Sequence, residues 1–356
     1  MRDMETGYWN AKGRGASANP ANRFVPLTFV PDPVAPDPDA PALATRFYDD
    51  ASESIITYNS SPDIPFNASV NPYRGCEHGC SYCYARPFHE YLGFSAGLDF
   101  ETKIMVKRRA PELLKKELAS PKWKPQLIAM SGVTDPYQPV EKRLGITRSC
   151  METLLDFRNP VGIVTKNRLV ARDLDILSEM AELQLCHVSF SINTLDAELA
   201  RKMEPRTSSP KARLEAVSAL ASVGIPVGVF VAPVIPGLND HELPAILKAA
   251  SEAGASYAIY ILLRLPYGVS DLFFDWLRRT YPTKSDKIES RVRSIRGGVL
   301  NRSEFGERFS GNGIFAEQTR QLYQAALRRS GLVDHLPELS LAHFRRPVSP
   351  QLELDL

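Results

Sequence analysis

Six short apolar runs alternate with helical segments through the middle of this 356-residue chain. The runs are rich in β-branched residues, and the segments between them repeat apolar residues with the period of a helix. This alternation predicts βαβ units and a parallel sheet whose strands end at a common edge. We expect strands at residues 66–73, 126–131, 161–165, 186–192, 226–234 and 257–263, and the clearest helices at 111–118, 174–183, 211–223 and 241–253.

Three cysteines lie in one loop directly after the first expected strand, at Cys76, Cys80 and Cys83. Three thiolates at this spacing can hold an iron–sulfur cluster, and because such clusters usually take four cysteines, one iron would remain open to another ligand. The cysteines would alternatively share one face of a helix as buried apolar side chains, although the glycines and polar residues between them disfavour a helix. A zinc site is a further alternative, with His78 or His89 as the fourth ligand.

The CxxxCxxC spacing, with the aromatic Tyr82 before the last cysteine, resembles the signature of the radical S-adenosylmethionine (SAM) superfamily. Within that superfamily, the stretch from Gly75 to Tyr84 most resembles the branch of spore photoproduct lyase, often described as DNA repair photolyase-like. The resemblance implies an α/β fold, a partial (β/α)6 TIM-like barrel with a helical C-terminal extension. It also implies a [4Fe–4S] cluster held by the three cysteines, with SAM bound at the open iron.

The resemblance further implies an enzyme that cleaves SAM reductively to a 5′-deoxyadenosyl radical, which abstracts hydrogen from an organic substrate. A low-potential donor of the flavodoxin or ferredoxin type would supply the electron. A nucleic-acid substrate, in a repair-like or modification-like reaction, follows from the branch analogy and from basic stretches. The alternatives are a radical SAM enzyme acting on a peptide or small metabolite, and a non-catalytic binding protein stabilised by a metal.

Polar residues follow the expected strands, at the edge where parallel α/β proteins place their sites. The resemblance places Tyr82 near the adenine of SAM, and Thr134 and Asp135 near its amino group. It places Lys166 at the SAM carboxylate, where a cation would make a charge-assisted hydrogen bond. Turn chemistry is the alternative for Thr134 and Asp135, and a surface position is the alternative for Lys166.

The fourth expected strand alternates polar and apolar residues, so that Ser189, Ser191 and Asn193 face one side. Inside a barrel that side is the lumen, where hydroxyl and amide groups suit ribose or carboxylate recognition. Glu204 and Arg206, followed by Arg213, resemble an element of the same branch that supports the site. An exposed Glu/Arg pair is the alternative for these residues.

One position departs from the branch pattern. Spore photoproduct lyase carries a cysteine just before its strand-two turn, which returns hydrogen to the product radical. Gly132 occupies the corresponding position here, so we do not expect this protein to repair spore photoproduct. Tyr84 and Tyr137 are the candidates for returning hydrogen instead.

The net charge of +2 does not by itself indicate nucleic acid. Basic residues gather at 103–124 and 278–296, either as solvated helix faces or as a phosphate-contacting surface. Five cysteines, three of them in one loop, make no disulfide framework, so Cys150 and Cys186 are expected as buried thiols. With no apolar run long enough to span a membrane, we expect a cytoplasmic protein without a membrane partner.

The predicted organisation has four parts. Residues 1–50 are expected as a disordered, Pro-rich arm because they show no apolar periodicity. Residues 51–269 form the predicted barrel core, and 270–335 the helical extension. Residues 336–356 are expected as a tail.

Overall fold

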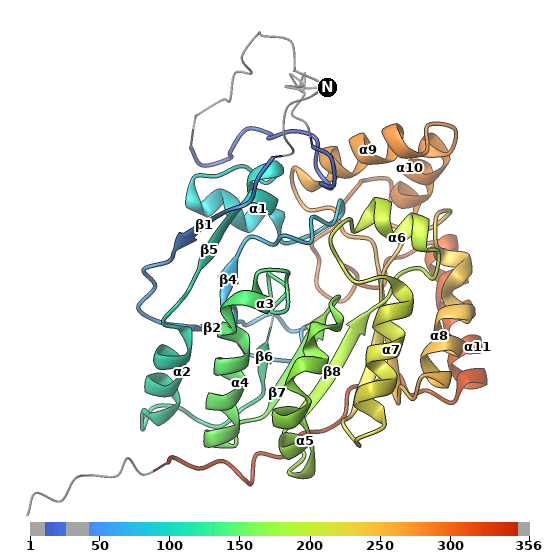
Figure 1. Ribbon diagram of the computed structural model, residues 1–356. Helices are drawn as coiled ribbons and strands as arrows, with labels where there is room; N and C mark the ends of the chain where they lie inside the picture. Colours follow the sequence, from blue (N-terminus) through green and yellow to red (C-terminus); the bar gives the residue numbers. More distant parts are fainter. Residues whose placement is uncertain (1–10, 26–42, 131, 348–356) are drawn as a thin grey trace, which may run out of the picture.

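The computed structural model describes residues 11–25, 43–130 and 132–347. Its main sheet has seven strands in the order β10-β9-β8-β7-β6-β3-β2 (Figure 1). Six strands are parallel and β2 pairs antiparallel with β3 at one edge. The strands are β2 (Ile56–Tyr58), β3 (Ala68–Val70), β6 (Ile128–Met130), β7 (Val161–Thr165), β8 (Cys186–Ser191), β9 (Val227–Val234) and β10 (Tyr257–Leu262). The predicted partial barrel with six parallel strands is confirmed.

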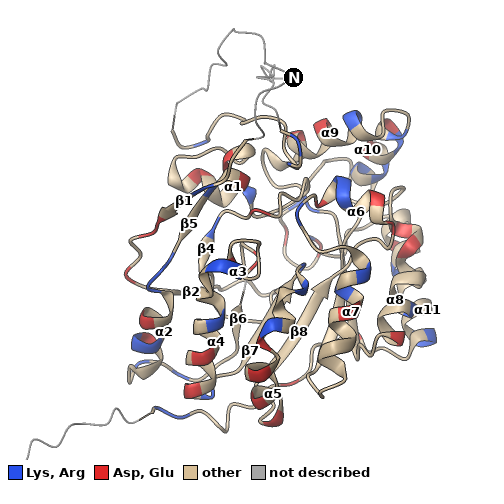
Figure 2. Cartoon of the chain, in the orientation of Figure 1, with Lys and Arg blue, Asp and Glu red and all other residues tan. Residues whose placement is uncertain are grey.

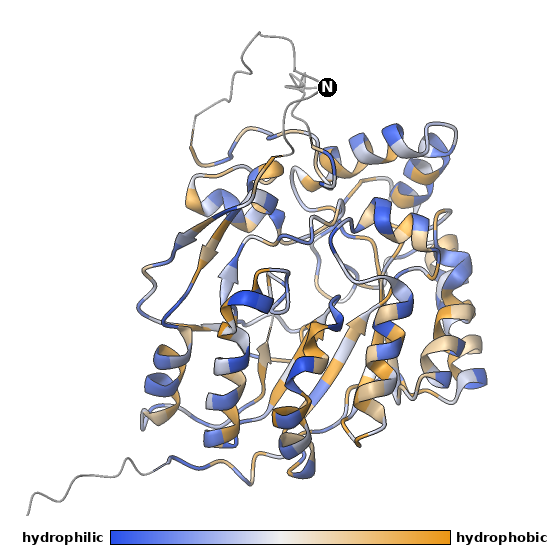
Figure 3. Ribbon diagram, viewed as in Figure 1, coloured by the Kyte–Doolittle hydropathy of each residue, from blue (hydrophilic) through white to orange (hydrophobic). Residues whose placement is uncertain are grey.

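Helices cover the outer face of this sheet and turn their apolar sides toward it (Figure 3). The fully buried strands carry the main core, as expected for a parallel sheet covered by helices. Ser209 begins one of these helices by accepting a hydrogen bond from the backbone of Ala212. The covering helices are α2 (Ala110–Ala119), α4 (Ile146–Phe157), α5 (Leu174–Glu182), α7 (Pro210–Ala221), α8 (Leu243–Glu252) and α11 (Ile314–Ser330).

The first predicted strand, 66–73, is two strands in the structure. Pro72 has no backbone N–H to donate to a ladder, and the chain leaves the main sheet there. The second piece, β4 (Tyr73–Arg74), joins a smaller sheet in the order β1-β5-β4, with β1 (Arg46–Asp49) and β5 (Lys103–Val106). The cysteine loop therefore begins between two sheets.

Residues 11–25 pack against the molecule, so the prediction of a disordered arm is wrong for them. We call this segment the N-terminal strap; Figure 1 shows it crossing the end of the molecule that carries α1 (Leu98–Thr102). The backbone N–H groups of Gly15 and Ala16 donate to the Glu101 carboxylate at 3.1 and 2.8 Å. The strap is held by hydrogen bonds to buried polar groups, and such contacts leave no apolar periodicity in the sequence. Residues 43–50 are also described and include β1, whereas 1–10 and 26–42 lie outside the described residues.

The C-terminal part packs on the barrel. The helices α9 (Val269–Thr280) and α10 (Ser285–Ser294) contact each other, and α11 packs on α8. Val333 then bridges to Tyr257, the first residue of β10, at the amino-end edge of the sheet. The predicted tail is hydrogen-bonded through its described part, where the Arg345 N–H donates to the Phe157 carbonyl at 2.9 Å, and 348–356 lie outside the described residues. No helix in the described ranges is long and apolar enough to cross a membrane.

Several cations of the two basic stretches are paired with acids. Figure 2 shows Lys and Arg interspersed with Asp and Glu on the outer helices. Arg108 pairs with Asp49, and Arg279 with Asp275 one helical turn away. These contacts favour the solvated-face interpretation over a continuous phosphate-binding surface.

A first prediction concerns the contact of the strap with the cysteine loop. A Cβ at Gly15 would lie 1.7 Å from the Gly79 carbonyl oxygen, so Gly15→Ala has to displace backbone. We expect the free energy of unfolding to fall by about 1–3 kcal/mol and proteases to cut the strap faster. Gly268→Ala is the control, because its Cβ would meet nothing within 4 Å. Equal urea midpoints for the two variants would contradict the packing of the strap.

Candidate functional site

The three cysteines lie in a turn-rich loop after β4, with Cys76 and Cys80 buried and Cys83 half-buried. The loop is not a helix, and its hydrogen bonds are short-range turns such as Cys83 N–H to Cys80 O at 3.3 Å. Burial raises the pKa of the Cys80 thiol well above its usual value and that of Cys83 to about 11. These two thiols are therefore protonated in the metal-free protein, and binding of a metal to them would release protons.

A buried arginine fixes the shape of this loop. Arg86, at the start of η1 (Arg86–Leu92), donates to the Cys80 carbonyl oxygen from Nε at 3.1 Å and from Nη2 at 2.8 Å. Its guanidinium also pairs with the fully buried Glu101 at 2.5 Å. Gly79 adopts φ +64°, and a Cβ there would lie 2.5 Å from the same carboxylate. Glycine is therefore required for the loop to approach Glu101.

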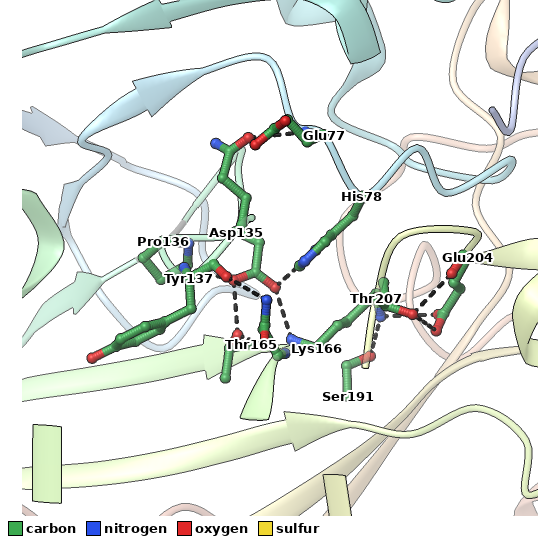
Figure 4. Close-up of polar contacts among 12 residues, drawn as sticks. Glu77, His78, Asp135, Pro136, Tyr137, Thr165, Lys166, Ser191, Glu204 and Thr207 are labelled. Atoms are coloured by element: carbon green, nitrogen blue, oxygen red, sulfur yellow. Dashed lines mark hydrogen bonds and ion pairs between the residues drawn. The ribbon is translucent and has the colours of Figure 1, made fainter. Parts of the chain in front are cut away.

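Asp135 joins the ends of β6 and β7 to the cysteine loop (Figure 4). Its carboxylate accepts from Thr165 Oγ1 and from the Lys166 backbone N–H, both at 2.7 Å, and its Oδ2 lies 3.3 Å from His78 Nδ1. Burial opposes ionisation of Asp135, but His78 and these hydrogen bonds outweigh it and lower its pKa. Burial likewise opposes the charge on His78, whereas Asp135 and Cys76 raise its pKa to about 10.

A second group of polar side chains gathers around Glu204. Glu204 accepts hydrogen bonds from the Tyr82 hydroxyl and from Arg213, and its Oε1 lies 3.4 Å from Lys166 Nζ. Lys166 also donates to Ser191, and its Nζ lies 5.7 Å from the Tyr82 ring centroid. Asn193 completes the group by donating to the Tyr82 hydroxyl at 3.3 Å. The structure thus brings together Tyr82, Lys166, Ser191, Asn193 and Glu204, which the sequence predicted as site residues.

This group suits a zwitterionic ligand with a carboxylate. Arg213 and Lys166 share one carboxylate, Glu204, so the group carries an excess positive charge. The Oδ1 atom of Asn193 is buried and has no hydrogen-bond partner in the described part of the chain. Since buried polar atoms are nearly always paired, a donor from a ligand would complete this site.

Three predicted site residues make their contacts outside the group around Glu204. Ser189 is buried deeper in the sheet, 2.8 Å from the Tyr257 hydroxyl. Arg206 points to the strap and donates to the Gly13 carbonyl at 3.3 Å. The Thr134 hydroxyl donates to the Tyr73 carbonyl at 3.4 Å.

The two candidate hydrogen donors differ in access. The Tyr84 hydroxyl donates to the Gly132 carbonyl oxygen at 2.7 Å, and 46% of the residue is accessible. Burial nevertheless raises the pKa of Tyr84 to about 12. Tyr137 is fully enclosed in the core. The geometry favours Tyr84.

Several site residues escaped the sequence analysis. His78 was considered only as a zinc ligand, and the Arg86–Glu101 pair was not noticed because its members lie 15 residues apart. Gln138 also holds the loop, since its Oε1 accepts from the Glu77 N–H at 2.9 Å and its Nε2 donates to the Gly75 carbonyl at 3.2 Å. The spacing of residues in the sequence does not identify these partners. A buried charge does, however, require a partner with which it pairs or hydrogen-bonds.

A second prediction concerns pH and Glu204. Burial opposes its ionisation, but Arg213 and Lys166 lower its pKa from 4.5 to about 2. The carboxylate therefore stabilises the fold above pH 4.5, and this stabilisation is lost as the pH falls toward 2. In urea unfolding of the metal-free protein, we expect the stability gap between wild type and Glu204→Gln to shrink from pH 6 to pH 3. An exposed carboxylate variant, Glu215→Gln, is the control, and a gap independent of pH would contradict this account.

Comparison with known proteins identifies the family. A family model described as the radical SAM superfamily matches residues 70–250. An uncharacterized protein of Mycobacterium tuberculosis is 37% identical over 234 residues, covering 65% of this chain and 68% of the relative. A radical SAM Nα-GlyT isomerase of Pseudomonas phage M6 is 22% identical, covering 61% of this chain and 44% of the relative.

The fold also matches solved structures. Spore photoproduct lyase complexed with dinucleoside spore photoproduct aligns with a TM-score of 0.57 and 17% identity, covering 81% of this chain and 80% of that one. At this identity the likeness concerns the fold. The family model covers half of the chain, including the cysteine loop and five of the six parallel strand ends, because it begins at Val70 and stops before β10. The chain belongs to the radical SAM superfamily.

Proposed function

We propose that Cys76, Cys80 and Cys83 hold a [4Fe–4S] cluster and that SAM binds beside it, against the group around Lys166. When bound, the two cofactors supply reductive cleavage of SAM to a 5′-deoxyadenosyl radical, with one electron from a flavodoxin-type or ferredoxin-type donor in the reducing cytoplasm. The radical abstracts hydrogen from an organic substrate. The observation that carries this proposal is the convergence of Lys166 and Tyr82 on Glu204 beside Cys80.

The residues have distinct roles in this proposal. Lys166 binds the SAM carboxylate, because Glu204 leaves part of its charge unbalanced. Tyr82 packs beside the adenine, and Asn193 offers its unpaired Oδ1 to a donor of the cofactor. Asp135 acts through its contacts with His78 and Lys166, as a positioning residue between loop and barrel.

The metal-binding alternative has less support. Within the described ranges, no three His, Cys, Asp or Glu side chains converge on a site for one ion. A structural zinc needs such convergence, whereas an iron–sulfur core spaces its cysteines apart. His89 is a buried side chain whose ring packs 5.3 Å from that of Phe94.

The substrate is an organic molecule that reaches Tyr84. Gly132 supports the exclusion of spore photoproduct as substrate, since it offers no thiol, and Tyr84 lies at the same position to return hydrogen. A peptide or small metabolite remains the second candidate, because several cations of the basic stretches are paired with acids and do not form a continuous free basic surface. A nucleic-acid substrate would need a binding surface other than the two basic stretches.

A third prediction tests cluster binding and cleavage together. Cys80→Ala should lose most of its iron and sulfide and form no 5′-deoxyadenosine from SAM under reducing, anaerobic conditions. Cys150→Ala removes a buried thiol outside the loop and should retain both. Iron retention by Cys80→Ala, or an equal loss in both variants, would contradict the ligand assignment.

A fourth prediction isolates the SAM carboxylate. Lys166→Gln should weaken SAM binding about 10- to 100-fold, because it removes one charge-assisted hydrogen bond. Its iron content should remain that of the wild type. Equilibrium dialysis with labelled SAM measures the change, with the exposed Lys248→Gln as control. Unchanged affinity would remove Lys166 from the site.

A further inference from the structure

Arg264 lies at the site edge and has no hydrogen-bond or ion-pair partner among the described residues. It follows β10, the last parallel strand, and is half-buried. Its Nε is buried without a hydrogen bond, and its guanidinium forms no ion pair with any residue that the structure describes. Its neighbours are rings, with Cζ 5.7 Å from the centroid of Tyr84 and 4.9 Å from that of Phe309.

A carboxylate does act on Arg264, but it belongs to Asp63, which already pairs with Arg308. Arg308 is nearby, but its own charge is paired with Asp63, to which its Nε donates at 2.7 Å. Burial, followed by Arg308, lowers the pKa of Arg264. The neighbouring Arg296 is also buried but donates to three backbone carbonyls, including Leu263 O at 2.7 Å. Arg264 is thus the cation at this edge that an external anion would complete.

Five exposed aromatic side chains, which we call the ring band, lie along η1, the strap and the segment after Arg264, and one of them, Tyr84, contacts Arg264. Their exposed fractions range from 46 to 66%, high values for large rings. Phe24 stacks on Tyr91 with centroids 4.7 Å apart, and Phe88 lies 6.4 Å from Tyr91. The ring band consists of Tyr84, Phe88 and Tyr91 on and before η1, Phe24 of the strap, and Tyr267 three residues after Arg264.

The ring band is held in place by its own contacts. The Arg23 guanidinium lies 3.8 Å from the Tyr267 centroid and 5.0 Å from that of Phe24, so it links two segments of the ring band. Glu90 balances this charge at 2.6 Å, which leaves Arg23 as an ordering group. Tyr267 adopts φ +51°, an unfavourable backbone conformation for a bulky residue, and 66% of the residue is exposed.

We propose that Arg264 and the ring band bind a single-stranded nucleic acid, with bases stacked on the rings and a phosphate on the Arg264 guanidinium. This inference rests on the proposed function, because the ring band begins at Tyr84, directly after Cys83. Successive exposed rings beside an arginine suit unpaired bases, since each base offers a π-face. The forked guanidinium suits phosphate oxygens. Large exposed apolar patches are rare on proteins without a partner for them.

A fifth prediction tests this binding on the reconstituted protein with SAM. Fluorescence anisotropy with a labelled single-stranded oligothymidylate should show binding that Arg264→Gln weakens about tenfold and whose salt slope it reduces by about 1. Arg264→Lys should recover part of the affinity. Phe88→Ala should weaken binding about tenfold, but should not affect an abasic strand that offers phosphates alone. The control is Arg328→Gln, which is exposed at the end of α11, near the amino end of β10 and away from the carboxyl end that Arg264 follows.

The outcomes separate this inference from the proposed function. Iron content and SAM affinity, measured on each variant, report the cofactor site. A wild type that retains both but binds no oligonucleotide would overturn the nucleic-acid inference and leave the proposed function intact. Unchanged oligonucleotide affinity in both Arg264→Gln and Phe88→Ala would overturn it as well, and so would selective capture of an acidic peptide by the same residues.

Discussion

One buried carboxylate, Glu101, connects the parts on which the site depends. It pairs with Arg86, which holds the Cys80 carbonyl, and it accepts the backbone N–H groups of Gly15 and Ala16. Burying such a charge is costly unless it is paired and hydrogen-bonded, and here the two oxygens accept from three donors. The cysteine loop, η1 and the N-terminal strap are therefore fixed relative to one another by a single residue of α1.

The polar residues of the site divide into two tasks. The Asp135 carboxylate contacts Thr165, Lys166 and His78, and these contacts order the strand ends beneath the loop. The group around Glu204 instead carries unbalanced charge and an unpaired acceptor, which are features of a surface that receives a ligand. A preorganised site for a cofactor requires both features. Hydrogen bonds must hold the backbone rigid, and some polar atoms must be left for the ligand to pair with.

Much of the fold was predictable because local patterns carried it. The strand at Val161–Thr165 was predicted at its observed bounds, and the six parallel strands followed from apolar runs between helices. The break at Pro72 and the strap were missed, since both depend on partners distant in sequence. The same holds for the site. Cysteine spacing and the polar residues at strand ends indicated Lys166 and Ser191. The roles of Arg86 and Arg264 were missed because they depend on contacts with residues distant in the sequence.

The most direct measurement of the central claim is an electron paramagnetic resonance spectrum of the anaerobically reconstituted, reduced protein, recorded with and without SAM. An open iron beside Lys166 predicts a [4Fe–4S] signal whose g values change when SAM is added. A cluster signal indifferent to SAM, or zinc in place of iron and sulfide, would contradict the account.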